Sequence, residues 1–372
     1  MNRPPALQKA LKIILIAMPL AVLGNLLYTA LSTGSSGFRI LLRIPLSWMG
    51  LAVLLSLVPW VFAFLRMKVW ASFFRLELKS KDLAEIVLAN DVAAVATPTA
   101  MGGGYAKVGL LIYHGARPGL AASLMVIGSI EDYLSMFLTV AVCWPFFAPE
   151  HLSLTVLAKK LYLAASQVSP VVPLGLLTAS GAVAFLWSVP TTRGLFSRLF
   201  RIDWIQRRII HPVRCAAADF RQAFALISRG GKGYFALNVF LAALQWAMRY
   251  SIFTVLAVGI GLSPHPITFF LMQWLVYMLM NFVPTPGAIG GAEVMFMLVF
   301  KGAIPPELLP VASAAWRFVS TYLMLIVAAV LMLLIQKPRM RRRPRAEGPT
   351  CPLPATPQMV KLEPVAEVTE LA

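Results

Sequence analysis

Apolar residues in this chain gather in long runs that are separated by short basic segments. Six of these runs are long enough to cross a lipid bilayer, since about 20 apolar residues cover its hydrocarbon core. They lie at residues 13–31, 46–65, 120–147, 171–189, 234–261 and 310–335. The pattern predicts an all-α polytopic membrane protein with six full spans, plus two apolar segments that are broken rather than continuous.

The two broken segments carry the same short phrase. Residues 97–103 read TPTAMGG and residues 285–291 read TPGAIGG. Proline and paired glycines interrupt helices, and a bilayer tolerates irregular backbone only inside protein or beside a watery cavity. The segments 83–116 and 266–304 therefore each predict a re-entrant helical hairpin, although the arm 266–283 is itself long enough to cross. The residues assigned to the broken-helix motif are Thr97, Pro98, Gly102, Gly103, Gly104, Pro284, Pro286, Gly287, Gly290 and Gly291.

Basic residues indicate which side of the membrane each loop faces. Lys and Arg are concentrated at 66–81, 193–232 and 337–345, and such an excess is typical of cytoplasmic loops. With six spans, this places the N- and C-termini in the cytoplasm and makes the two hairpins enter from opposite sides. The repeat halves, about 44–147 and 234–335, are then inverted copies, an arrangement typical of transporters.

The segments outside the two halves are basic. The connector 190–233 mixes apolar and basic residues, as does an amphipathic helix on an anionic membrane surface. A solvated basic linker explains the same composition. The tail 338–372 is basic and then rich in proline, and we expect it to be disordered because it has too little apolar surface to fold alone.

Composition supports the membrane interpretation. Of 372 residues, 59% are hydrophobic and only 13% are charged, with a net charge of +18. Because the positive charges flank apolar runs, we expect no nucleic-acid partner. Three scattered cysteines (Cys143, Cys215 and Cys351) and four isolated histidines predict no metal site, and no cofactor is expected. The first apolar run is too long for a signal peptide and is expected to be an uncleaved helix.

Ionisable residues inside apolar spans need partners and are functional candidates. Glu131 and Asp132 lie within 120–147, and Arg317 lies within 310–335. Glu131 and Arg317 follow Gly102 and Gly290, respectively, at similar distances along the chain. Their opposite charges suggest an ion pair or a coupled pair that binds a zwitterionic or anionic headgroup, whereas a static buried pair is the structural alternative.

Further polar residues lie beside the breaks. Helix N-termini there present free N–H groups to an anion, so we expect Lys107 and Arg317 to contact a phosphate. Glu293 either positions a cation or caps its helix. Arg249, one turn from Gln245, either faces the cavity or extends to an interface.

The full set expected to bind substrate is Glu131, Asp132, Glu293, Arg317, Lys107 and Arg249. Asn90, Asp91 and Asn281 precede the breaks and are expected to hydrogen-bond exposed backbone, which is a structural role. We expect the breaks, Glu131, Glu293 and Arg317 to line one cavity.

Residues 281–293, NFVPTPGAIGGAE, and residues 315–322, AWRFVSTY, resemble the signature of the lysylphosphatidylglycerol synthase transmembrane region. This is a flippase-like (UPF0104-type) membrane protein family. The resemblance covers most of residues 10–337 and identifies 1–337 as a flippase-like transmembrane domain. The positions that match are Pro284, Pro286, Gly287, Gly290, Glu293 and Arg317. Asn90, Pro98 and Gly102 fit the first half of the pattern loosely.

The resemblance implies movement of lipids or lipid-linked headgroups between leaflets. Asp132 stands where the family usually has an arginine after Glu131, which points to a different headgroup. The synthase members carry a soluble aminoacyltransferase domain after the membrane part. No such domain follows here, so aminoacyl transfer is not expected.

The sequence therefore predicts a flippase in a bacterial inner membrane that moves a polar, phosphate-bearing headgroup of a membrane lipid or polyprenyl-linked substrate. No enzyme is expected, because the spans lack a Ser/His or paired-Asp motif. Two alternatives stay open: a proton-coupled carrier of a small solute, using Glu131 and Asp132, or an accessory subunit of a lipid- or glycan-modifying enzyme. A homodimer is compatible with the sequence, although no motif specifies one.

Overall fold

The computed structural model describes residues 44–97, 101–146 and 211–335, apart from 282, 284 and 286. The spans expected at 13–31 and 171–189, residues 190–210 of the connector, the tail 338–372 and the motif prolines Pro98, Pro284 and Pro286 lie outside the described residues. Within this part of the chain all elements are helical and no strand occurs. The helices are α2 (Leu46–Phe73), α3 (Ser80–Ala96), α4 (Met101–Tyr113), α5 (Pro118–Cys143), η1 (Trp144–Phe146), α10 (His211–Gly230), α11 (Lys232–Gly259), α12 (Pro266–Met280), α13 (Gly291–Phe300), α14 (Leu309–Arg317), η4 (Phe318–Tyr322) and α15 (Leu323–Ile335).

Four helical stretches among these residues are long and apolar enough to cross a membrane. They are Leu46–Phe73, Pro118–Phe146, Lys232–Gly259 and Leu309–Met332. They coincide with four of the expected spans, but α2 continues beyond residue 65 to Phe73. Apolar and aromatic residues resume after Arg66 and Lys68, so these two charges do not end the helix. The expectation that Arg66 lies in a loop is therefore wrong, because it lies within α2.

The broken segments form pairs of short helices. Helices α3 and α4 have 17 and 13 residues, or about 25 and 20 Å at 1.5 Å per residue. The pair α12 and α13 has 15 and 10 residues. All four are shorter than the roughly 30 Å hydrocarbon core. The arm 266–283 thus contains no crossing helix, because α12 ends at Met280.

The first break lies earlier than the glycines that were expected to form it. Gly102, Gly103 and Gly104 belong to α4, while α3 ends at Ala96. Thr97 Oγ1 accepts a hydrogen bond from Gly102 N at 2.8 Å and donates to Ala93 O at 2.9 Å. A Cβ on Gly103 would lie 2.7 Å from Asn90 O. The glycines therefore allow α3 and α4 to approach closely, and Thr97 links their ends.

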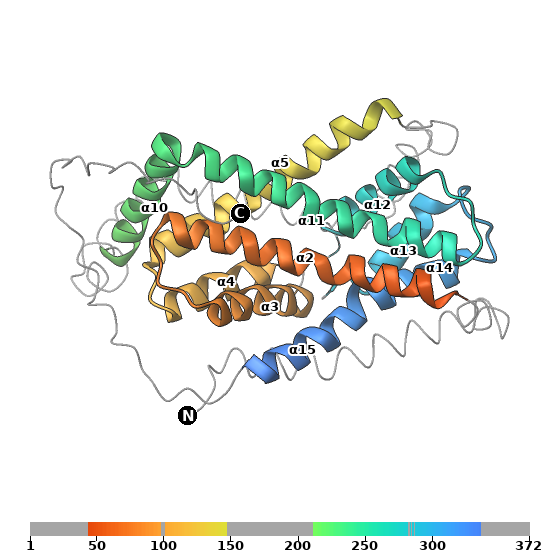
Figure 1. Cartoon of the computed structure of the whole chain (residues 1–372), viewed down its shortest axis with the longest axis horizontal. Helices are drawn as coiled ribbons and strands as arrows, with labels where there is room; N and C mark the ends of the chain where they lie inside the picture. Colours follow the sequence, from red (N-terminus) through yellow and green to blue (C-terminus); the bar gives the residue numbers. More distant parts are fainter. Residues whose placement is uncertain are drawn as a thin grey trace, which may run out of the picture.

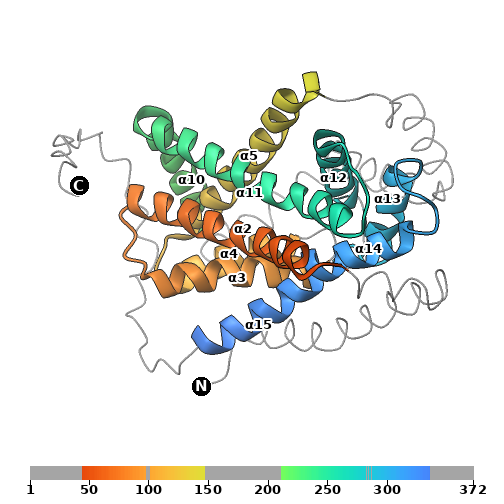
Figure 2. The same cartoon turned by 45° about the vertical axis from the view of Figure 1, so that its right-hand side comes forward.

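The same order of elements occurs twice: a long helix, two short helices and a second long helical stretch. The second stretch is α5 in the first set, and α14, η4 and α15 in the second set. Helices α2 and α11 begin the two sets, pack extensively along each other, and run in opposite directions (Figure 1). The α3–α4 and α12–α13 hairpins lie toward opposite ends of this central pair in both views (Figures 1 and 2). The second long helical stretch of the second set is interrupted, because the π-helical turn η4 separates α14 from α15.

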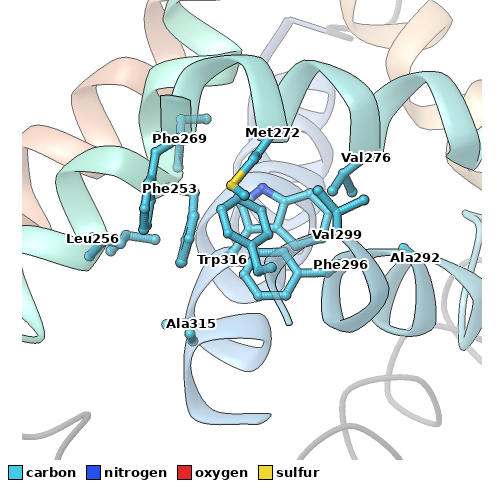
Figure 3. Close-up of a cluster of buried hydrophobic side chains, with 14 of the residues drawn as sticks. Phe253, Leu256, Phe269, Met272, Val276, Ala292, Phe296, Val299, Ala315 and Trp316 are labelled. Atoms are coloured by element: carbon cyan, nitrogen blue, oxygen red, sulfur yellow. The ribbon is translucent and has the colours of Figure 1, made fainter. Parts of the chain in front are cut away.

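Packing of aromatic rings fixes the second set of helices. Phe253, Phe269, Phe296 and Trp316 converge from α11, α12, α13 and α14 (Figure 3). The Phe296 and Trp316 rings stack with centroids 5.2 Å apart, which anchors α14 against α13. A separate buried cluster joins the two sets, since it includes Trp60 of α2, Val87 and Val92 of α3, and Leu325 and Ala328 of α15.

Candidate functional site

A cavity of about 340 Å³ lies between the two sets of helices. Residues from α2, α3, α5, α11, α12, α14, η4 and α15 all contribute to its wall. The polar and charged side chains that line it are Ser56, Trp60, Asp91, Ser129, Asp132, Tyr133, Trp246, Arg249, Tyr277, Asn281, Trp316, Arg317, Ser320 and Thr321. A cavity of this size is in the range of small-molecule sites.

The second break reaches the first set of helices at this cavity. Gly287 has φ +62°, a left-handed conformation that glycine adopts without steric cost. A Cβ at Gly287 would lie 3.0 Å from Val95 Cγ1, near the end of α3. The cavity is therefore lined near the breaks by Val95, Gly287 and Ala288, whereas the expected Gly102, Gly103, Gly104, Gly290 and Gly291 do not line it.

Arg317 holds the second break in place. Its Nε donates to Glu293 Oε1 at 3.0 Å, its Nη1 to Thr321 Oγ1 at 3.0 Å and its Nη2 to Gly287 O at 2.9 Å. The Arg317 and Glu293 side chains are 1% and 11% exposed. Each nitrogen of the guanidinium is thus engaged, which makes Arg317 a clamp between α14, α13 and the break.

Arg249 lies across the same cavity in a different environment. Its Nη2 donates to Asp91 Oδ2 at 3.0 Å, and the two side chains are 25% and 30% exposed. Its Nε is buried and has no hydrogen-bond partner among the described residues. The guanidinium carbon lies 5.5 Å from the centroid of Trp246. Arg249 therefore keeps an N–H donor without a protein acceptor, whereas every nitrogen of the Arg317 guanidinium donates a hydrogen bond.

A third charged group joins α2, α5 and α11. Arg66 Nη2 lies 2.9 Å from Glu131 Oε2, and Arg66 Nη1 lies 2.6 Å from Asp132 Oδ1. Gln245 Oε1 also accepts from Arg66, at 3.0 Å. Trp70 Nε1 donates to the other oxygen of Glu131 at 2.8 Å. This network, Arg66 with Glu131, Asp132, Gln245 and Trp70, reaches the cavity only through Asp132.

Several charged residues that were expected from the sequence to share one site lie apart in the structure. The suggested Glu131–Arg317 ion pair is wrong, because Glu131 pairs with Arg66 and Arg317 pairs with Glu293. Glu131 and Glu293 do not line the cavity. Lys107 does not line it either, and its Nζ lies against α5, 3.1 Å from where a Cβ of Gly128 would be. Glu293 lies in the first turn of α13, but the N-cap residue is Gly290.

Of the six expected substrate-binding residues, Asp132, Arg249 and Arg317 line the cavity. Arg66 and Asp91 were missed as charged groups of the site. Arg66 could have been found from the sequence, because the apolar and aromatic residues that follow it indicate that the helix continues past it. Asp91 had no comparable signal, since its partner Arg249 is 158 residues away in the sequence. No three His, Cys, Asp or Glu side chains of the described chain are grouped to hold a metal ion.

The charged cavity and the apolar helices define a multi-pass helical membrane protein. The family model described as the lysylphosphatidylglycerol synthase TM region matches residues 10–328. A UPF0104 membrane protein of Archaeoglobus fulgidus is 23% identical over 303 residues, which cover 75% of this chain and 84% of that relative. No solved structure matches the chain. The chain belongs to the lysylphosphatidylglycerol synthase transmembrane family, and this membership fits a lipid-related role in a membrane.

Proposed function

We propose that this protein is a flippase that moves lipids with a phosphate-bearing headgroup between the leaflets of a bacterial inner membrane. The headgroup enters the 340 Å³ cavity while the acyl or prenyl chains stay in the bilayer. The observation that carries this proposal is Arg249, which lines the cavity and keeps a buried Nε without a partner among the described residues. An anion is the natural partner for a guanidinium with unused donors.

Other wall residues suit a phosphate ester. Asn281, Ser320 and Thr321 supply neutral amide and hydroxyl groups on the wall formed by the second break and η4. Hydrogen bonds from such groups to phosphate oxygens orient a headgroup without adding charge. The substrate ligands proposed here are therefore Arg249 and these neutral groups, whereas Arg317 shapes the cavity.

An inverted repeat is part of the proposal. It is supported by the repeated element order, by the opposite directions of α2 and α11, and by the hairpins toward opposite ends of that pair (Figures 1 and 2). Broken helices meeting around a site between inverted halves are the architecture by which many transporters alternate access. Cytoplasmic termini follow from this arrangement together with the basic loops.

The test is lipid movement in proteoliposomes that contain fluorescent phosphatidylglycerol. Wild type is expected to expose inner-leaflet lipid to a membrane-impermeant quencher, and Arg249→Gln is expected to slow this movement. A hydrogen bond to a charged group contributes about 1.5–3 kcal/mol, so the loss is at least about tenfold. Arg221→Gln in α10 is the matched control, since Arg221 is exposed and does not line the cavity.

Two results would contradict the proposal. Equal rates for wild type and a folded Arg249→Gln protein would exclude Arg249 as the headgroup ligand. Folded wild type that moves neither phosphatidylglycerol nor a fluorescent polyprenyl phosphate would refute the flippase, and would favour a carrier of soluble solutes or an accessory subunit.

A further inference from the structure

We propose that Asp91 carries one proton across the membrane with each phosphate headgroup, so that transport is driven by a pH gradient. This inference rests on the proposed flippase and adds its energy source. The motivating observation is the Asp91–Arg249 ion pair, which stands in the cavity wall where the headgroup would bind.

The Asp91–Arg249 pair is the most open of the three arginine–carboxylate groups in the described helices. Its side chains are 25% and 30% exposed, whereas those of Arg317 and Glu293 are 1% and 11% exposed. In the Arg66 network, Asp132 is 34% exposed, but Arg66 and Glu131 are only 10% and 1% exposed, so the cation of that network is not open. Both members of the Asp91–Arg249 pair line the cavity, so a ligand there can reach the guanidinium and the carboxylate directly.

A phosphate headgroup and Asp91 compete for the same cation. Arg249 Nη2 is occupied by Asp91, and a guanidinium binds phosphate best through two parallel N–H groups. Binding through Nε and Nη2 therefore displaces Asp91. One guanidinium cannot neutralise two anions in this partly desolvated wall, and Asp91, although 30% exposed, would be costly as a carboxylate without a cation.

Displaced Asp91 removes this cost when one of its carboxylate oxygens binds a proton from the aqueous solution on the side to which the cavity is open, so that no hydroxide is left in the cavity. Trp60 Nε1 donates to Asp91 Oδ2 at 2.8 Å, and Asn90 Nδ2 donates to Oδ1 at 3.1 Å. These neutral donors leave the carboxylate without a second cation. One phosphodiester charge enters and one proton binds, so the net charge of the cavity is unchanged. Release of the headgroup returns Arg249 to Asp91 and frees the proton.

The other charged groups near Asp91 have their own partners. Asp132, on α5, is held by Arg66 and also accepts from Trp246 Nε1 at 3.2 Å. Arg317, on α14, is paired with Glu293. The cavity wall also contains two phenols, Tyr133 on α5 and Tyr277 on α12.

Among the described residues, the other helices packed against α3 place no ionisable side chain in the cavity wall. His114, which follows α4, lies 3.8 Å from Asp82 and 3.5 Å from Glu85 of α3, and none of these three lines the cavity. The described residues of α15, Leu323–Ile335, are all apolar. On α4, Lys107 lies against Gly128 of α5 and is not part of the cavity wall. On α2, Arg66 is committed to Glu131 and Asp132. Asp91 is thus the carboxylate of the cavity whose cationic partner is also the proposed headgroup ligand.

The test uses the full chain in liposomes with fluorescent phosphatidylglycerol, a pH-sensitive dye in the lumen, and a potential clamped at zero by potassium and valinomycin. Wild type is expected to move lipid toward the alkaline side several-fold faster than toward the acidic side, and lipid movement is expected to shift luminal pH. Asp91→Asn is expected to lose both responses, whatever its basal rate. Asp219→Asn, the same change in α10 outside the cavity wall, is expected to keep both.

The outcomes separate the coupling from the flippase. Wild type that moves lipid equally in both gradients, with no luminal pH change, would overturn the coupling and leave the flippase intact. An Asp91→Asn protein that still responds to the gradient would also overturn it. Wild type that moves no lipid would refute the flippase and this inference together. If Asp91→Asn does not fold, the wild-type measurement decides, and Asp91→Glu is expected to keep the direction of the response.

Discussion

The backbone oxygen of Gly287 accepts a hydrogen bond of 2.9 Å from Arg317 Nη2. This contact ties the left-handed turn of the second break to the end of α14, while Nε of the same guanidinium binds Glu293 of α13. The arginine of the family signature therefore assembles the cavity wall. Arg249, which lies outside the signature, lines the cavity and keeps a buried Nε without a partner among the described residues.

Arg317→Gln is expected to destabilise the protein. The substitution leaves Glu293 as a buried carboxylate without a cation, and breaking a buried pair costs about 3–5 kcal/mol. The midpoint of thermal unfolding in detergent is expected to fall by many degrees. Arg317→Lys is expected to recover only part of the loss, because an ammonium cannot make all three contacts of the guanidinium.

The double variant Arg317→Leu with Glu293→Leu separates charge from packing. Removing both charges avoids the unpaired carboxylate, so this protein is expected to unfold at a higher temperature than Arg317→Gln. A double variant no more stable than Arg317→Gln would show that the hydrogen bonds to Gly287 and Thr321, rather than the ion pair, supply the stability.

Arg66→Met is expected to be strongly destabilising for a related reason. Glu131 would lose its cation while remaining 1% exposed, at a cost of about 3 kcal/mol or more. Lys68→Met, two residues further along α2, is the control, since Lys68 is exposed. Thermal unfolding of the two proteins checks this. Equal midpoints would contradict a structural role for the Arg66 network.

Gly103→Ala tests the close approach of α3 and α4. The added Cβ would lie 2.7 Å from Asn90 O, so the helices must separate, and overpacking of this kind costs about 1–3 kcal/mol. Gly109→Ala in the same helix meets no atom within 4 Å and is expected to be neutral or stabilising by up to about 1 kcal/mol. The order of their unfolding midpoints is the measurement, and the reverse order would contradict the packing described here.

Cysteine labelling tests whether water reaches the cavity. Ser320 lines it, whereas Ser313 is 2% exposed in the helical core. In a protein whose three native cysteines are replaced by serine, Ser320→Cys is expected to react with a small hydrophilic thiol reagent much faster than Ser313→Cys. Addition of phosphatidylglycerol is expected to slow labelling at position 320. Similar rates at both positions would indicate that the cavity is closed to water.

Much of the fold was predictable because its signals are local. The helices α2, α5 and α11 appear in the sequence as long apolar runs, and α3 with α4 and α12 with α13 appear as apolar segments too short to cross once they are interrupted. The α2 span was expected to end at residue 65, because the local hydropathy falls at Arg66 and Lys68. The helix itself continues to Phe73. The π-helical turn η4 after Arg317 had no local signal.

The sequence by itself determined the membrane class, the family, the existence of two breaks and the list of charged residues inside apolar segments. These properties depend on side-chain chemistry and on neighbours along the chain. Only the tertiary structure decided which charges meet. An ion pair requires two atoms within about 4 Å, and Arg66 and Glu131 are 65 residues apart, while Asp91 and Arg249 are 158 apart. Helix packing brings these residues together. It therefore decided, where the spacing of motifs could not, that Glu131 pairs with Arg66 and that Arg249 lines the cavity.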